Sequence, residues 1–454
     1  MNRHVWKRLV ALLVCLCLLA SAALAQEDEL AVTRSDFALS LSLHADAFPE
    51  SNSVHYADWE HFLSKLSLEG VIDAQRFLQT YSRSYFSGGL CLNGEMALPF
   101  EYDDYYGFRY VRADALGGAN IHFHMYNFFE FMLKGYFFMG LPTQLLAILM
   151  YPEASHRLGA TYYAPIAEAL GGDEARQVSY DDLYALCETL TLIAYDEDFY
   201  DHVYFYVTCL LTDLGVSDAT VDKLCYVEGW LEYLDPEQGG MTISREGDEM
   251  VYEVGEYTLA RRALDGTRLT LSLPDMDGYV LNVDYQNGSG VFRFSASVDL
   301  DGEERLAVAL SVDGLDGGTD MAGTAAFSVG GTALEGGTEQ AFSWRYTRDA
   351  QELPYAMTLA IDWLHPETGL AALTLNYRAN MERVPETVLV ERTYDDKNDF
   401  FSLNEWKLAE FQERFTPTLA LSAVPFLLEM PAGVIDDLVA FAYDTGLLAF
   451  FGLE

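Results

Sequence analysis

The feature that most constrains this chain is a long stretch of alternating apolar and polar residues between Met241 and Arg378. Successive side chains of a strand point to opposite faces, so this alternation predicts a sheet with one apolar and one polar face. Turn signals such as Asn287-Gly288 and Asp301-Gly302 supply the positive φ that tight hairpins require. An antiparallel β-meander is therefore predicted over residues 241–400. The apolar positions of its strands are Leu269, Leu271 and Leu273; Leu281, Val283 and Tyr285; Phe292, Phe294, Ala296 and Val298; Leu306, Val308, Leu310 and Val312; Phe342, Trp344 and Tyr346; Met357, Leu359, Ile361 and Trp363; and Leu373, Leu375 and Tyr377.

The residues before this stretch follow a different pattern. Residues 36–46 alternate and predict a strand, and several further β segments are predicted up to residue 125. The segment from Tyr126 to Met150 is an apolar, aromatic run broken at Gly140-Leu141-Pro142, and helical segments follow it. The segment 235–240, Asp-Pro-Glu-Gln-Gly-Gly, interrupts the helical pattern and is the predicted domain boundary. The helices before this boundary are predicted near residues 162–170, 180–195, 198–213 and 218–233.

Helical signals return at the C-terminal end of the sequence. Ser402 and Glu405 have the spacing of a capping box, which predicts a helix from Ser402 to about Phe415. Prolines bracket the apolar stretch 417–431, and a last helix is predicted over 432–450.

The expected fold class is therefore α+β. An N-terminal mixed domain, with segregated α and β parts and a helical cluster, precedes an antiparallel β-meander that is sandwich-like or an open half-barrel. The C-terminal helices are expected to cover the meander. Whether the N-terminal strands join the meander sheet is left open by the sequence. The expected organisation is a signal peptide at 1–25, an α+β domain at 26–235 (β-rich over 36–125, helical over 126–235), the meander at 241–400 and a helical segment at 401–454.

The first 25 residues have the pattern of an export signal. A positively charged segment (1–8) precedes an apolar core (9–20), and the small residues Ala23 and Ala25 predict cleavage between Ala25 and Gln26. No small residue precedes either cysteine of this segment, so lipid attachment is not expected. The mature protein is expected to be soluble, and either extracellular or associated with the cell envelope.

The chain is strongly acidic. It carries 27 Lys and Arg against 70 Asp and Glu, a formal net charge of −43. The predicted signal removes three basic residues, so the mature chain has 27 − 3 = 24 basic residues against 70 acidic ones, a net charge near −46. A field of this sign repels nucleic acid and anionic membrane surfaces. The apolar stretches near 135–151 and 417–450 are interrupted or carry acids, so no transmembrane span is expected after signal cleavage.

Four cysteines follow the predicted signal: Cys91, Cys187, Cys209 and Cys225. The last three fall on apolar faces of predicted helices, where free cysteine behaves as a small hydrophobic residue. Buried thiols are the favoured interpretation, and one disulfide among the helical three is the alternative. The spacing matches no metal-binding pattern.

An acidic and aromatic segment supplies the candidate catalytic residues Glu101, Asp103 and Asp104, which lie among tyrosines. Paired carboxylates beside aromatic side chains suit glycoside hydrolysis. In a chain with 70 acidic residues, however, a solvated hairpin tip is the favoured interpretation.

Two segments supply candidate metal ligands. His122 and His124 are predicted on one face of a strand, and Asp395, Asp396 and Asp399 resemble part of a calcium loop. Neither segment completes a ligand set. Polar-face histidines that pack beside Tyr and Phe are the favoured interpretation of the first segment, and adventitious calcium binding is left open for the second.

We find no nucleophile elbow, phosphate loop or zinc-protease motif in the sequence, and no cofactor is expected. A non-catalytic exported protein is therefore favoured, one that binds an apolar small molecule, a lipid or an envelope component, or supports the cell envelope. In architecture alone, a meander around an apolar face resembles the open half-barrels of bacterial lipoprotein carriers, which implies an apolar groove. The alternatives are an extracellular, glycan-directed hydrolase that uses the clustered carboxylates or histidines, and a structural or adhesive module.

Overall fold

The described residues form nineteen strands and five α-helices, which fall into two compact units. Unit 1 comprises Met1–Met139, Gly318–Met321 and Phe342–Glu454, and unit 2 comprises Gly140–Gly317 and Ala322–Ala341. The computed structural model describes residues 32–49, 54–77, 81–105, 108–124, 163–194, 240–255, 257–272, 279–288, 290–315, 318–329, 338–385, 388–389, 400–402 and 408–445.

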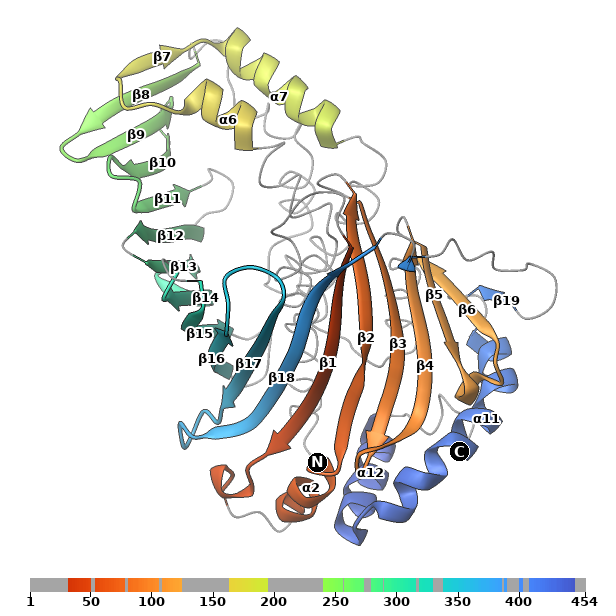
Figure 1. Ribbon diagram of the computed structural model, residues 1–454. Coiled ribbons are helices and arrows are strands. Elements are labelled where there is room, and N and C mark those ends of the chain that lie inside the picture. Colours follow the sequence, from red (N-terminus) through yellow and green to blue (C-terminus); the bar gives the residue numbers. More distant parts are fainter. Residues whose placement is uncertain are drawn as a thin grey trace. The chain divides into compact units, whose positions relative to one another are not determined.

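Unit 1 is built on a sheet whose strands pair in the order β17-β18-β1-β2-β3-β4-β5-β6-β19 (Figure 1). All of these pairs are antiparallel except β19 with β6, which is parallel. The strands are β1 (Val32–Leu43), β2 (Leu66–Phe77), β3 (Tyr81–Leu92), β4 (Glu95–Tyr105), β5 (Phe108–Ala113), β6 (Asn120–His124), β17 (Tyr355–Leu364), β18 (Ala371–Val384) and β19 (Phe400–Ser402); β16 (Thr338–Arg348) lies in unit 1 from Phe342 onward.

The first strand joins the two ends of the sequence. Phe37 of β1 lies opposite Ala379 of β18 on one side and Gly70 of β2 on the other. Because β1 places apolar residues at Phe37, Leu39, Leu41 and Leu43, it continues the apolar face of β18, where Leu373 and Leu375 are buried.

The expected fold class is therefore wrong. The N-terminal strands and the last meander strands are neighbours in an extensive antiparallel sheet, and a separate mixed α/β domain with a helical cluster is not seen in the described residues. The physical reason is that β1–β18 pairing joins residues about 340 positions apart, and local alternation does not say which strand a segment pairs with.

Three helices of unit 1 pack against its sheet and bury its apolar side chains. Trp59 and Phe62 of α2 pack in one cluster with Trp363 of β17, and Phe426 of α11 belongs to the same cluster. A second cluster joins Phe415 of α11 to β5, β6 and β19. The helices are α2 (Tyr56–Leu63), α11 (Leu408–Glu429) and α12 (Ala432–Thr445), with short 3-10 turns η1 (Ala45–Ala47) and η2 (Asp114–Leu116).

A buried carboxylate fixes α12 on α2. Asp437 is 2% exposed and accepts hydrogen bonds from the His55 backbone N–H (3.0 Å), His55 Nδ1 (3.1 Å) and Trp59 Nε1 (2.9 Å). Gly433 permits the close approach, because a Cβ there would lie 2.5 Å from His55 Cγ and 2.4 Å from Asp58 Oδ2. The buried charge is thus satisfied by three donors, as a carboxylate removed from water requires.

The predicted C-terminal helices are only partly correct. Ser402 lies in β19, and α11 begins at Leu408 and continues through Pro417 and Pro425 to Glu429. Proline usually ends a helix because it lacks the N–H donor and clashes with the preceding turn. Here Phe415 and Phe426 are buried on either side of the prolines, so tertiary packing holds both parts of the helix in place.

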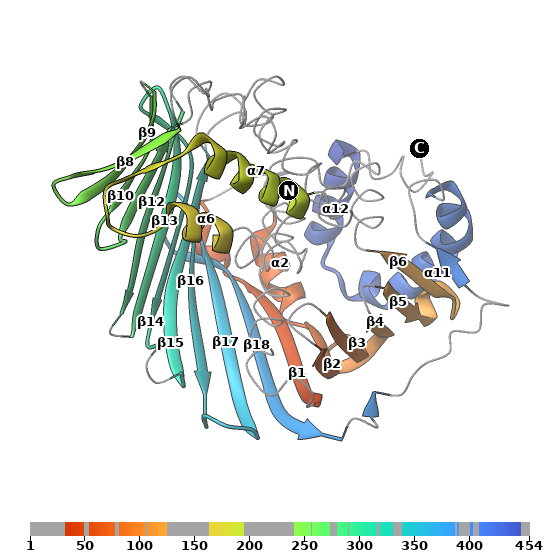
Figure 2. The same ribbon diagram turned by 90° about the horizontal axis from the view of Figure 1, so that it is seen from above.

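Unit 2 is a strand meander with two helices at one end. Each strand from β7 to β14 pairs antiparallel with the strand that follows it. Figure 2 shows the strands seen from above. The elements are α6 (Tyr163–Leu170), β7 (Arg176–Val178), α7 (Tyr180–Ala194), β8 (Met241–Glu246), β9 (Glu249–Val254), β10 (Tyr257–Ala263), β11 (Arg268–Ser272), β12 (Tyr279–Gly288), β13 (Val291–Leu300), β14 (Glu303–Asp313) and β15 (Asp320–Val329).

The local features of unit 2 follow from the sequence. Between β13 and β14, Asp301 and Gly302 have φ of +55° and +81°, the left-handed conformation that the Asp-Gly pair predicts. Ser179 accepts a hydrogen bond from the Asp182 backbone N–H (3.1 Å) and caps α7. The helices predicted near 198–213 and 218–233, the apolar run that starts at Tyr126, and the signal at 1–25 lie outside the described residues.

Candidate functional site

The candidate carboxylates Asp103 and Asp104 are adjacent residues of β4 and therefore point to opposite faces of the unit 1 sheet. Asp104 lies 3.3 Å from Arg109 Nη2 and accepts a hydrogen bond from Tyr102 Oη at 3.4 Å. Burial raises the pKa of the Tyr102 phenol far above its usual range, and the Asp104 charge adds to this effect. Asp104 is thus part of a largely buried ion-pair cluster.

Asp103 belongs to a row of polar side chains on the other face. Register places it beside Tyr85 and Tyr110, with Asp73 and His122 at the ends of the row. Asp103 and Asp73 are each 4% exposed, and both Asp73 oxygens accept from Arg34, at 2.7 and 2.9 Å. The hydrogen bond to Asp73 raises the Arg34 pKa. Glu101 lies on the same face, opposite Arg112.

One of the two candidate histidines, His122, lies at the end of this row. The His122 ring is 5.0 Å from the ring of Tyr110, and burial lowers the His122 pKa. His124 lies opposite Phe108 in the backbone register. Among the described residues there is no group of three or more His, Cys, Asp or Glu that could hold a metal ion. Asp395, Asp396 and Asp399 lie outside the described residues.

Cys91 and Cys187 are free, buried thiols, as expected. Burial raises the pKa of both thiols, which keeps them protonated and poorly reactive. Cys209 and Cys225 lie outside the described residues.

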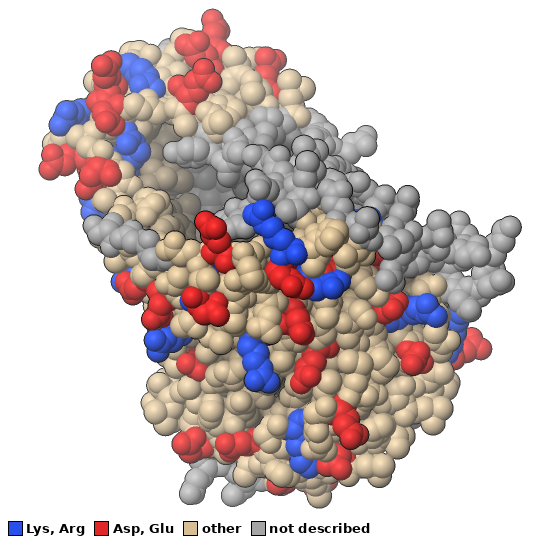
Figure 3. All heavy atoms as spheres, in the orientation of Figure 1, with Lys and Arg blue, Asp and Glu red and all other residues tan. Residues whose placement is uncertain are grey.

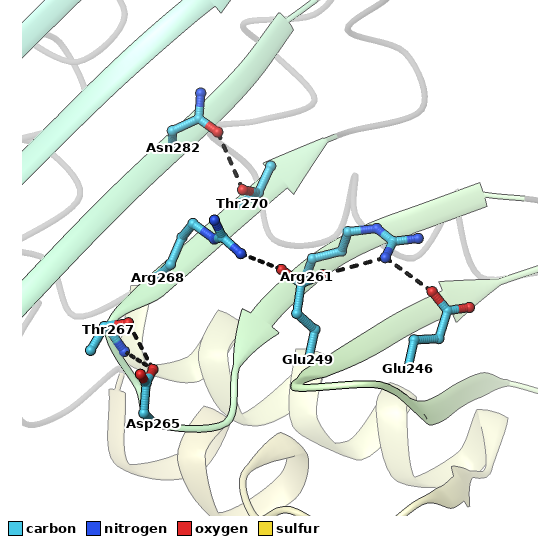
Figure 4. A network of polar contacts seen from close by, with 8 residues as sticks. All are labelled: Glu246, Glu249, Arg261, Asp265, Thr267, Arg268, Thr270 and Asn282. Carbon is cyan, nitrogen blue, oxygen red and sulfur yellow. Dashed lines mark hydrogen bonds and ion pairs between the residues drawn. The ribbon is translucent and has the colours of Figure 1, made fainter.

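The polar face of the unit 2 meander is held together by its own contacts (Figure 4). Arg261 of β10 lies 3.0 Å from Glu246 and 3.5 Å from Glu249, and Arg268 of β11 also pairs with Glu249. Farther along the same face, Thr270 donates to Asn282. These side chains lie on one side of the sheet because their strands are paired in register, Arg261 opposite Thr270 and Thr270 opposite Asn282.

Similar contacts continue across the later strands. Asn282 donates to Asp299 (2.8 Å), Arg293 pairs with Asp313 (2.7 Å), and the Ser311 and Thr324 hydroxyls are hydrogen-bonded (2.7 Å). The named polar groups of this face pair with one another at largely exposed positions, so they contribute little to stability and do not converge on a common point.

The opposite face of the meander is apolar and lies across β11–β15. Register forms continuous rows, such as Leu269-Val283-Ala296-Val308 and Tyr285-Phe294-Leu310-Ala325. We call this set the meander face. None of its side chains is buried: Leu310 is 36% and Tyr285 42% exposed, and the others are at least partly exposed. The meander face consists of Leu269, Leu271, Leu281, Val283, Tyr285, Phe292, Phe294, Ala296, Val298, Val308, Leu310, Val312 and Ala325.

The same side of the sheet is covered at its β8–β10 end. Ile243, Met250 and Tyr252 are at most 7% exposed and pack in one cluster with Leu183 of α7 and Leu170 of α6. The Tyr252 hydroxyl donates to the Leu170 carbonyl oxygen at 3.3 Å. The helices therefore bury apolar side chains of β8 and β9 on this side of the sheet, while the side chains of β11–β15 keep part of their apolar surface exposed.

Sequence reasoning found most of the meander face but missed β15. The glycines around residues 314–337 interrupt the alternation, so Ala325 carries too weak a signal to identify a strand. Its position is set by pairing with β14, where Ala325 lies opposite Leu310. Alternation also could not show that α6 and α7 cover one end of the sheet and leave the meander face partly exposed.

Within the described part of the chain, no helix combines the length and apolar character needed to cross a membrane. No protein-family model matches the sequence, and no curated protein matches it. A comparison with solved structures finds a likeness to OmpT (in-vitro folded), an outer membrane protein of Vibrio cholerae. The identity is 7%, the match covers 79% of this chain and 99% of that chain, and the TM-score is 0.18, which does not indicate a shared fold.

Proposed function

We propose that this protein is a non-catalytic binding protein that holds a neutral, extended apolar ligand, such as a lipid acyl chain, on the meander face. One observation carries the proposal: thirteen apolar side chains lie in continuous rows across β11–β15, and none of them is buried. A contiguous apolar surface that keeps contact with water is typical of a binding surface.

The energy available from this surface is sufficient for specific binding. Completing the burial of a leucine that is 36% exposed, as Leu310 is, gains on the order of 1 kcal/mol, at about 25 cal/mol per Å² of apolar surface. Covering several residues of the meander face would therefore offset the loss of ligand freedom, which costs several kcal/mol.

Charge limits the class of ligand. The net charge of the chain is −43. Arg262, which lies opposite Leu269 on the side of the meander face, is already paired with Asp173, and Arg293 and Arg261 of the polar face are paired with Asp313 and with Glu246 and Glu249. An anionic head group would meet an unfavourable potential and no unpaired arginine among these. A neutral or zwitterionic lipid is therefore the preferred ligand class.

The predicted export signal supports a role outside the cytoplasm, where an envelope lipid is an available ligand. The glycan-directed hydrolase receives no support from the geometry of its candidate residues, because Asp103 and Asp104 point to opposite faces of β4 and Asp104 is paired with Arg109.

Binding of the neutral apolar dye N-phenyl-1-naphthylamine to residues 26–454 tests the proposal, with native mass spectrometry of the freshly purified protein as a second readout. We expect Leu310→Glu to weaken dye binding at least tenfold, because it places a charge in the middle of the meander face. The matched control is Ala309→Glu, which places the same charge one residue away on the polar face and should change binding less than twofold.

Two results would contradict the proposal. If the wild-type protein binds no dye and carries no adduct, the meander face is closed by the protein's own chain. If Leu310→Glu and Ala309→Glu weaken binding equally, the dye binds elsewhere.

A further inference from the structure

The outward face of α11 changes character halfway along the helix. In the first half its exposed positions are charged, with Glu410, Glu413 and Arg414. From residue 417 the same face is apolar, and Leu421 and Leu428 are 71% and 81% exposed. A surface helix normally places polar residues toward water along its whole length. The second half of α11 therefore presents an apolar surface that the fold of this unit does not use.

The next helix, α12, also carries exposed apolar side chains. Ile435, Val439 and Tyr443 follow one another at four-residue spacing on α12 and are 39%, 49% and 72% exposed. The opposite side of α12 carries Val434 and Asp437, which are buried against α2. Because the inward side of α12 is already packed, folding of the unit does not require its exposed apolar residues. We call the exposed set the C-terminal patch: Leu421, Val424, Leu427, Leu428, Ile435, Val439 and Tyr443.

The C-terminal patch is almost free of charge in a chain that is otherwise acidic. No Asp, Glu, Lys or Arg occurs from Phe415 to Leu428. At the end of α11, Glu429 is paired with Lys65 at 2.9 Å, and this pairing lowers the Glu429 pKa. Asp436 is an exposed acid on α12. Figure 3 shows a broad uncharged area over α11 at the lower right.

We propose that the C-terminal patch is an isologous interface with a second copy of this chain. Two copies with 70 acidic and 27 basic residues each repel one another, and most contacts would bring acidic side chains together. The uncharged patch can meet its own counterpart without that repulsion. Its seven large side chains offer apolar surface on the scale of the roughly 800 Å² per partner that a standard interface buries.

A second copy fits the patch better than a membrane surface. Helices that lie on membranes carry lysine and arginine along their polar face to engage the head groups. Here Arg414 is the last basic residue of the sequence, and it lies before the patch. Depletion of charge at the centre and an aromatic residue such as Tyr443 are typical of protein–protein interfaces.

Sedimentation equilibrium of residues 26–454 between 1 and 100 µM tests the proposal. We expect a dimer that the Leu421→Glu/Leu428→Glu double variant converts to a monomer, with at least a hundredfold increase in the dissociation constant. Leu192→Glu is the matched control, because Leu192 is a leucine of α7 that is 76% exposed and lies in the other unit. This control should remain dimeric. Far-UV circular dichroism and a thermal melt check that the double variant is folded.

A monomeric wild-type protein at 100 µM, or a dimer that persists in the folded double variant, would overturn the proposal. Flotation with phosphatidylcholine vesicles adds a second discriminating result: patch-dependent flotation of a monomeric wild type would identify a membrane-binding surface instead. Dye binding to the meander face is independent of this interface, so failure of either proposal leaves the other measurable.

Discussion

The sheet of unit 1 and the meander of unit 2 arise from the same alternating pattern but end in different states. In unit 1, α2, α11 and α12 cover the apolar face, and Trp363, Leu373 and Phe401 are at most 1% exposed. In unit 2, α6 and α7 cover the β8–β10 end, and the meander face stays partly exposed, with Tyr285 at 42%. Alternation thus creates an apolar face, and the elements that pack on it decide whether that face becomes core or surface.

The sharpest way to test this difference is to remove the same side chain from each region. Phe401→Ala should lower the free energy of unfolding by about 3–5 kcal/mol, because a fully buried ring leaves a cavity. Phe294→Ala, on the meander face, should cost only about 1–2 kcal/mol, since its ring keeps part of its contact with water. Urea unfolding followed by tryptophan fluorescence measures both. Equal losses would mean that the meander face is a closed core.

A second test concerns the polar contact that fixes the helical cover of unit 1. Asp437→Ala should destabilise the protein by about 2–3 kcal/mol, because Trp59 Nε1 and two His55 groups lose a buried charged acceptor. Asp436→Ala is the matched control at an exposed neighbour and should change stability by less than about 0.5 kcal/mol. Thermal melts of the two variants give the comparison. If both behave alike, α12 is held on α2 by apolar packing alone.

The smallest change in the free energy of unfolding is expected from the buried phenol of Tyr102. The folded-state pKa of Tyr102 is raised by burial, so its contribution to stability is fully present below the unfolded pKa of about 10 and is lost as pH rises above it. We expect the wild type to lose about 1.4 kcal/mol between neutral pH and pH 11 through this group. Tyr102→Phe should remove that part of the alkaline loss, as measured by urea unfolding at pH 8 and pH 11. An unchanged pH dependence would show that Tyr102 ionises freely in the folded protein.

The candidate site residues show where sequence reasoning reached its limit. The favoured interpretation of Glu101, Asp103 and Asp104 as a solvated hairpin tip is wrong, because all three lie in β4 and Asp103 is 4% exposed. Adjacent residues of a strand point apart, so Asp104 joins Arg109 while Asp103 joins the row of Tyr85 and Tyr110. That row draws on strands far apart in the sequence. Sequence periodicity does not determine such neighbours, since they depend on strand register.

What the sequence determined by itself is local. The alternation of β11–β14, the Asp301-Gly302 turn and the cap at Ser179 each depend on interactions within a few residues, and each was predictable. The tertiary structure alone decided that β1 pairs with β18, that α11 continues through its prolines, and that α6 and α7 cover one end of the meander. These outcomes are set by the free energy of burying apolar surface between segments far apart in the chain, which no local pattern contains.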